Sequence, residues 1–239
     1  MSALVLVRHG QASFFASDYD KLSAIGEQQL RHVGTHWAAQ RLVIDEVFTG
    51  PRMRQRDSAR LAGEEYQKAG LTWPEPIVLD ELDEYDLDGL TKNVAPQLAA
   101  VNSEFAQMAM SYLQSAGELD KLRSFQRMFE MLLRHWQADQ SERTDVETWA
   151  KFRQRVNGVI RRVQTQTARS RRVVFFTSGG FIGCAAHLAL AAPDATALEL
   201  NWRVRNASFT EFVFNQDRLS LDSFNSVPHL EHPDLWTYR

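Results

Sequence analysis

Four short stretches of the sequence hold residue types that could do chemistry on an anion. They are Arg8-His9-Gly10, Arg52-Met53-Arg54, the acidic run Asp80–Asp86, and Ser178-Gly179-Gly180. Arginine donates bidentate, charge-assisted hydrogen bonds to phosphoryl oxygens, and a glycine-bearing helix N-terminus adds free backbone N–H groups. An imidazole between arginines is held neutral, which leaves a nitrogen lone pair for attack on phosphorus. A nearby carboxylic acid could protonate the leaving oxygen.

Each stretch has an ordinary interpretation when it is taken alone. Arg-His-Gly is more often a loop than a catalytic site, and the arginines at 52, 54 and 56 are typical of a solvated helix face. The acidic run is typical of a surface turn, and Ser-Gly-Gly of a tight turn between a strand and a helix. Their combination, in this order and at strand ends, favours a phosphate site. We see no spacing typical of metal ligands and no Walker-type loop, and we expect neither a metal nor another cofactor.

Apolar runs must position these stretches. Two apolar runs predict buried strands, at Ala3–Val7 and Arg172–Thr177. A second short strand is predicted at Val43–Phe48, and Ile77–Leu79 is a third short apolar run. Each of these runs precedes one of the four stretches. Ligands of open α/β sheets bind just outside the carboxyl ends of the strands. We therefore expect the four stretches to meet at one edge of a sheet.

The pattern predicts an α/β fold with three layers: a mostly parallel central sheet flanked by helices. A helix capped by Ser23 is predicted to run to about Gln40, with Leu30, Val33 and Trp37 on one face. The later runs Phe209–Phe214 and Leu219–Phe224 predict a β-hairpin or an edge pair of strands. Further helices are predicted at 52–68 and 181–191. The whole chain, 1–239, is interpreted as one domain with a helical insertion at about 92–166, which is a candidate lid. Within it Phe125, Met128, Phe129, Leu132, Leu133 and Trp136 form a core stripe.

Composition bounds the class of protein. The 239 residues are 44% hydrophobic and 24% charged, which is ordinary for a globular protein. The net charge of -3 gives no reason to expect nucleic acid or an anionic membrane as a partner. One cysteine, Cys184, excludes an internal disulfide, and no apolar run is long enough to cross a membrane. We expect a cytoplasmic protein that acts on a small phosphorylated substrate, and we leave its oligomeric state open.

The motifs resemble those of the histidine phosphatase, or phosphoglycerate-mutase-like, superfamily. Val7–Ala12 matches the Arg-His-Gly motif of that family, which implies that His9 is a nucleophile that becomes phosphorylated. Tyr19–Leu30 resembles the helix start of the family, whose pattern is Leu-Ser/Thr-x-x-Gly-x-x-Gln-Ala. Thr49–Ala59 resembles Ser-Ser-Pro-Leu-x-Arg-Ala-x-Gln-Thr-Ala. In this register Arg54 is the phosphate-clamping arginine, and Arg52 stands at an ordinarily apolar position.

The resemblance also suggests a general acid. Leu82-Asp83-Glu84 followed by Gly89 is similar to the family segment Leu-x-Glu … Gly, which makes Glu84 the candidate acid and leaves Glu81 as the alternative. Asn206-Ala207-Ser208 resembles a late strand entry that we interpret as structural. The resemblance thus implies catalysis by His9, Glu84, Arg8 and Arg54, and phosphate binding by Arg8, Arg54, Gln11, Ser178 and Gly179.

Two departures from the family pattern bear on function. Family members usually carry a second histidine in Ser/Thr-His-Gly-Gly, where this chain has Thr177-Ser178-Gly179-Gly180. A serine hydroxyl can donate a hydrogen bond but supplies no positive charge, and loss of one such contact typically costs ~10²–10³ in rate. The cofactor-dependent mutases carry Arg-His-Gly-Glu-Ser-x-Trp-Asn, and the glutamate, tryptophan and asparagine are absent from Arg8–Phe15. The two departures together favour a phosphatase over a mutase. The alternative is a non-catalytic phospho-ligand binding protein, in which Ser178 marks the loss of catalysis.

Other polar residues have plainer interpretations. His187 lies in an apolar helix and is expected to pack in the core, whereas His229 and His232 in the tail could reach the site. The basic run Lys151–Arg172 has helical spacing and is interpreted as a solvated helix face.

Overall fold

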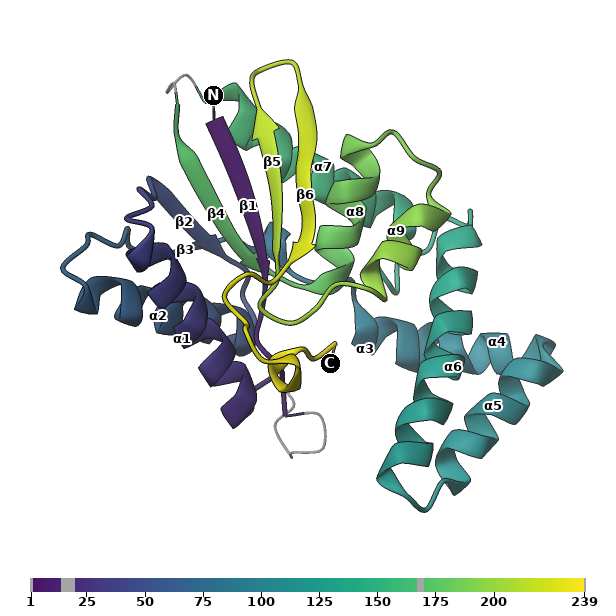
Figure 1. Ribbon diagram of the computed structural model, residues 1–239. Coiled ribbons are helices and arrows are strands. Elements are labelled where there is room, and N and C mark those ends of the chain that lie inside the picture. The colour runs from purple at the N-terminus through teal and green to yellow at the C-terminus, as the bar shows by residue number, and fades with distance from the viewer. Residues whose placement is uncertain (1, 14–19, 167–169, 239) are drawn as a thin grey trace. The chain divides into compact units, whose positions relative to one another are not determined.

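The computed structural model describes residues 2–13, 20–166 and 170–238 (Figure 1). The chain divides into two compact units, one of Met1–Glu84 with Arg155–Arg239 and one of Tyr85–Gln154. The first unit contains the sheet and the second is helical. The helical insertion expected at about 92–166 thus begins seven residues after the start of the helical unit and ends after the end of that unit.

A six-stranded sheet forms the core of the first unit, in the order β3-β2-β4-β1-β5-β6. The pairs β3–β2, β2–β4 and β4–β1 are parallel, and β1–β5 and β5–β6 are antiparallel. The strands are β1 Ser2–Arg8, β2 Glu46–Thr49, β3 Ile77–Val78, β4 Arg172–Thr177, β5 Phe209–Phe214 and β6 Leu219–Ser226. The prediction of a mostly parallel sheet with a terminal hairpin is confirmed.

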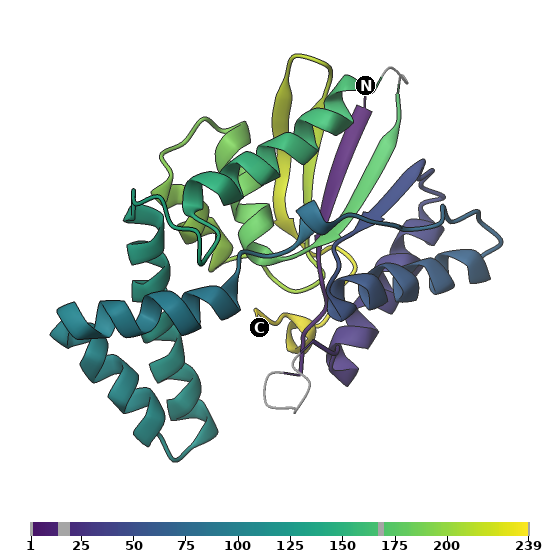
Figure 2. The same cartoon turned by 180° about the vertical axis from the view of Figure 1, so that it is seen from behind.

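Helices cover both faces of this sheet (Figures 1 and 2). On one face lie α1 (Ala24–Ala39) and α2 (Met53–Lys68), whose apolar side chains share a core with Val5, Val7 and Phe176. On the other, Phe181 of α8 (Gly179–Ala189) packs edge-on against Phe175. The same unit contains the later part of α7 (Trp149–Thr165), α9 (Ala195–Asn201) and the 3₁₀ turns η1 (Asp80–Leu82) and η3 (Pro233–Leu235). The three-layer prediction holds.

The first helix forms where its sequence predicts. The Ser23 side chain accepts a hydrogen bond from the Gly26 N–H and so caps α1, and Leu30, Val33 and Trp37 are buried. Trp37 stacks on Phe209 of β5 with ring centroids 5.1 Å apart. By contrast, the strand expected at 43–48 begins only at Glu46, because the carboxylate of Asp45 accepts the Arg172 N–H.

The helical unit has its own aromatic core. It consists of α3 (Leu87–Gly89), the π turn η2 (Leu90–Val94), α4 (Ala95–Val101), α5 (Ser103–Gln114), α6 (Glu118–Ala138) and the start of α7. Phe129, Leu132, Leu133 and Trp136 of the predicted stripe are buried. The Trp136 ring packs against Trp149, and its indole N–H donates to the Glu147 carbonyl at 2.7 Å. The stripe is therefore core, as expected. No helix in the described ranges is long and apolar enough to span a membrane.

Candidate active site

His9 immediately follows the last residue of β1, the strand between β4 and β5. Its N–H donates to the Thr177 carbonyl at 2.9 Å, which continues the ladder with β4 by one residue. Its carbonyl accepts the Asn206 side-chain amide at 3.1 Å. The N–H bond thus places His9 as an extension of the β1–β4 ladder, and the Asn206 side chain holds its carbonyl.

Gly10 lets the first turn of α1 approach the segment that holds His9. A Cβ at this position would lie 2.5 Å from the Gly26 carbonyl oxygen and 2.5 Å from Cδ2 of Leu30. The Gly10 N–H donates to Ser58 Oγ of α2 at 3.1 Å. Glycine at this position therefore serves close packing of two helices around the strand tip.

The His9 imidazole is buried and neutral. Its Nδ1 lies 2.7 Å from the Gly10 carbonyl, and because a carbonyl only accepts, Nδ1 carries the proton. Its Nε2 accepts from Arg54 Nε at 3.2 Å. Burial, and then the charges of Arg54 and Arg8, hold the pKa of His9 well below its usual value. The site thus presents an uncharged ring whose lone pair is on Nε2.

Two arginines flank this ring. Arg54 is the second residue of α2, is buried, and orients its Nε toward His9. Arg8, the last residue of β1, donates from Nη1 to the Val204 carbonyl. An added Cβ on Gly179 would lie 3.6 Å from Arg8 Cζ, so the guanidinium packs against the first residue of α8. Two predicted phosphate ligands and the predicted nucleophile are therefore brought together.

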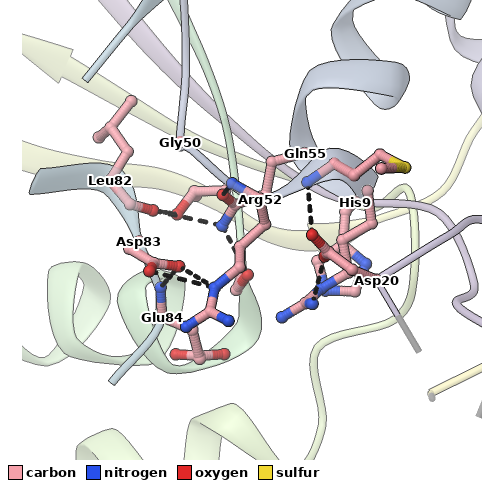
Figure 3. A network of polar contacts seen from close by, with 12 residues as sticks. His9, Asp20, Gly50, Arg52, Gln55, Leu82, Asp83 and Glu84 are labelled. Atoms are coloured by element: carbon pink, nitrogen blue, oxygen red, sulfur yellow. Dashed lines mark hydrogen bonds and ion pairs between the residues drawn. The ribbon is translucent and has the colours of Figure 1, made fainter. Parts of the chain in front are cut away.

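Asp20 already occupies one side of Arg54. Its Oδ1 lies 2.7 Å from Arg54 Nη1, and its Oδ2 accepts the Met53 N–H at 2.7 Å (Figure 3). Met53 is the first residue of α2, where an anion meets free N–H groups and the positive end of the helix dipole. A carboxylate therefore sits at a place suited to a phosphoryl group. Most of the Gln11–Lys21 loop, residues 14–19, lies outside the described residues.

Ser178 is fully buried beneath Gln55. The Gln55 side-chain amide donates to Ser178 Oγ at 2.8 Å, and its Oε1 accepts the Arg52 N–H at 3.1 Å. Gln55 stands where the family pattern has alanine, and Ser178 where it has histidine. A phosphate-binding role for Ser178, and for Gly179, stays a prediction.

Glu84 lies at the N-terminus of α8. Its Oε2 accepts the Gly180 N–H at 3.1 Å, and its own N–H donates to Asp83 Oδ1 at 2.7 Å. The Asp83 carboxylate in turn pairs with Arg52 Nε at 2.8 Å, as Figure 3 shows. The acidic run is thus attached to the N-terminal ends of α2 and α8, where Arg54 and Ser178 also lie.

Glu81, the alternative acid, turns to the surface. Its carboxylate pairs with Arg162 of α7 at 3.0 Å. A hydrogen bond from its own N–H, and then Arg162, lower the pKa of Glu81 below its usual value. A carboxyl group that holds its proton weakly is a poor general acid at neutral pH, which counts against Glu81. Glu84 as the general acid stays a prediction.

Gln11 takes part in positioning the loop. Its Oε1 accepts from Ser23 Oγ at 2.8 Å, and its N–H donates to Gln29 Oε1 at 2.9 Å. Its predicted phosphate contact stays a prediction. Of the other histidines, His187 is buried in α8 as predicted, and His229 is buried against Phe209 with ring centroids 4.5 Å apart.

Sequence reasoning did not single out Asp20, Gln55 or Arg155, whose side chains contact Arg54, Ser178 and the Glu84 carbonyl, respectively. The signal that could have marked Gln55 is its departure from the family pattern, which has alanine at this position. No group of His, Cys, Asp and Glu side chains suited to a metal ion occurs in the described part of the chain.

Comparisons with known proteins identify the family of this chain. The model of the histidine phosphatase superfamily, branch 1, matches residues 4–127 and 114–227. The chain belongs to this superfamily. The sequence matches no curated protein at a significant level.

Solved structures share the fold of this superfamily member at low sequence identity. The alpha-ribazole phosphatase of Shigella flexneri is similar with a TM-score of 0.61 and 18% identity over 94% of this chain and 96% of that one. The phosphoglycerate mutase of Bacillus anthracis has a TM-score of 0.63 and 16% identity over 96% and 95%. A mycobacterial glucosyl-3-phosphoglycerate phosphatase has a TM-score of 0.60 and 20% identity over 94% and 98%. The superfamily and these neighbours support an enzyme.

Proposed function

We propose that this protein is a metal-independent phosphomonoesterase that acts on a small phosphorylated substrate through a phosphohistidine at His9. The observation that carries the proposal is the buried, neutral His9, with its proton on Nδ1 and its lone pair on Nε2 beside Arg54. Such a nitrogen is a nucleophile at neutral pH without prior deprotonation.

In the first step, Nε2 of His9 forms a bond to phosphorus while the bond to the ester oxygen breaks. Arg54 exchanges its contact with Nε2 for phosphoryl oxygens, and Arg8 stabilises the same group from the Gly179 side. Glu84 donates its proton to the leaving oxygen, which departs as an alcohol.

In the second step, the Glu84 carboxylate takes a proton from water as the water oxygen attacks phosphorus. The Nε2–phosphorus bond breaks, inorganic phosphate leaves, and His9 and protonated Glu84 are restored. Two arginines supply the positive charge that a metal ion gives to other phosphoryl-transfer sites.

Hydrolysis of 4-nitrophenyl phosphate by the full-length chain tests this proposal. We expect turnover that EDTA leaves unchanged and that His9→Asn reduces to the uncatalysed level. A phosphohistidine should be trapped by rapid acid-free quenching and located at His9 by mass spectrometry. His135→Asn, at an exposed position of α6, is the matched control and should keep full activity. Turnover that persists in His9→Asn, or that EDTA abolishes, would overturn the mechanism.

A second candidate is a phospho-ligand binding protein without turnover. The burial of the Ser178 hydroxyl beneath Gln55 favours it, because no imidazole stands where the family has its second histidine. It predicts phosphate binding by calorimetry together with no turnover and no phosphohistidine.

A further inference from the structure

One arginine holds three backbone carbonyls of the acidic run. Arg155 of α7 donates from Nη1 to the Glu81 carbonyl at 2.9 Å and to the Asp83 carbonyl at 2.8 Å. Its Nη2 donates to the Glu84 carbonyl at 3.2 Å. A single planar guanidinium therefore contacts three of the four carbonyls from residue 81 to residue 84.

The remaining carbonyl is held by side chains as well. The Leu82 carbonyl accepts Thr177 Oγ1 at 2.7 Å and the Gln55 amide at 3.4 Å. The backbone from residue 81 to residue 84 has little regular structure to hold it. The 3₁₀ turn η1 ends at Leu82, and the pairing of β3 with β2 ends earlier, at Val78. Side-chain donors thus do the work that a sheet ladder does for His9.

Glu84 and Arg155 are also the residues at which the chain leaves and re-enters the sheet unit. The helical unit begins at Tyr85 and ends at Gln154. The bond from Arg155 Nη2 to the Glu84 carbonyl therefore joins the two crossing points of the chain. This bond holds the last residue of one segment of the sheet unit to the first residue of the other segment.

We propose that Arg155 is the positioning residue for the general acid. It fixes the backbone of Glu84, while the Gly180 N–H at the start of α8 orients the Glu84 carboxylate. This inference rests on the proposed function of Glu84. Lysine cannot replace Arg155 fully, because an ammonium group lacks the planar fork that spans several carbonyls.

The test compares two esters that differ in their need for an acid. The alkoxide of glycerol 2-phosphate needs a proton to leave, and the 4-nitrophenolate of 4-nitrophenyl phosphate does not. We expect Arg155→Met to lower kcat/KM for glycerol 2-phosphate by about 10- to 100-fold, because a misplaced acid loses most of its contribution. The loss for 4-nitrophenyl phosphate should stay below about 3-fold. For glycerol 2-phosphate, the kcat/KM of Arg155→Lys should lie between that of Arg155→Met and that of the wild type.

Controls separate positioning from folding. Arg162→Met, two turns further along α7, removes only a half-exposed pair with Glu81 and should leave the ratio of the two rates unchanged. This ratio does not depend on how much of a preparation is folded, so a poorly folding Arg155→Met still reports on the acid. In a Glu84→Gln background, Arg155→Met should cause no further loss with glycerol 2-phosphate.

Each outcome has a distinct meaning. If Arg155→Met lowered kcat/KM equally for both esters, so that the ratio of the two rates did not change, the role of Arg155 would be overturned. Full additivity of Arg155→Met with Glu84→Gln would overturn it as well. A wild type that hydrolyses neither ester would instead refute the proposed function, and the positioning role would fall with it.

Discussion

The segment that carries His9 and the segment that carries Glu84 belong to the same unit but are held by different means. His9 extends a central strand, and its backbone groups bond to Thr177 and Asn206. Glu84 follows a short 3₁₀ turn, and its backbone depends on the side chains of Asp83 and Arg155. A group on a strand inherits its position from a cooperative ladder, whereas a group on a loop needs individual donors. Substitutions at the two segments should therefore have effects of different kinds.

Gly10→Ala should have the largest effect on activity, because it disrupts the packing of the segment that holds His9. The new methyl group would lie 2.5 Å from the Gly26 carbonyl and from Leu30, so either β1 or α1 must shift. A displacement near 1 Å at the nucleophile costs about 10²-fold in rate, and we expect at least this loss of kcat/KM for both esters.

Gly158→Ala is the matched control for this substitution. An added Cβ at this position of α7 meets nothing within 4 Å, and alanine favours a helix over glycine. Full activity in Gly10→Ala would show that the strand tip tolerates movement.

His229→Phe should make the stability of the sheet unit less dependent on pH. Burial, and then the charges of His36 and His32, lower the pKa of His229 to about 3. The unfolded chain therefore binds more protons between pH 3 and pH 6.5, so the wild type is stabilised as pH rises and loses stability as pH falls.

Between pH 7 and pH 5 this loss amounts to about 2 kcal/mol for His229 alone. Urea unfolding at both pH values should show a smaller difference for His229→Phe, which keeps a ring against Phe209. His135→Phe, at an exposed site, should retain the wild-type difference. Equal differences in wild type and His229→Phe would show that His229 does not titrate as its burial implies.

Asp20→Asn should tighten the binding of inorganic phosphate. The Asp20 carboxylate holds Arg54 Nη1 and the Met53 N–H, both of which a phosphoryl group could use. Removing this competing charge should lower the dissociation constant by about 5-fold, or about 1 kcal/mol, measured by calorimetry.

Asp57→Asn, which removes a partly exposed pair with Arg60 on the same helix, should leave phosphate binding unchanged. Weaker binding by Asp20→Asn would show that Asp20 positions Arg54 rather than competing with phosphate.

Arg52→Leu should have the smallest effect, although it restores the residue type usual for the family. The pair with Asp83 is partly exposed, so its loss should change the free energy of unfolding by less than about 1 kcal/mol. Because Arg155 still holds the backbone, kcat/KM for glycerol 2-phosphate should fall by less than about 3-fold. A loss as large as that of Arg155→Met would mean that Asp83, not Arg155, governs Glu84.

Much of the fold could be predicted because its signals are local. The apolar runs that became β1 and β4, the Ser23 cap of α1 and the buried stripe of α6 each depend on neighbours along the chain. The meeting of Arg8, His9 and Arg54 could be predicted too, because parallel strands deliver their carboxyl ends to one edge.

The sequence by itself determined the order of the chemical groups along the chain. Arg8 ends an apolar strand and His9 follows it, Arg54 comes after β2, and the acidic run comes after β3. Only the tertiary structure decided which groups are engaged by one another. Asp20 contacts Arg54 across 34 residues, Gln55 contacts Ser178 across 123, and Arg155 contacts Glu84 across 71. Side-chain donors on helices carry no periodic signal that marks their acceptors, and a basic run with helical spacing looks the same whether it faces water or a loop. The partners of such groups depend on packing between elements, which no local pattern encodes.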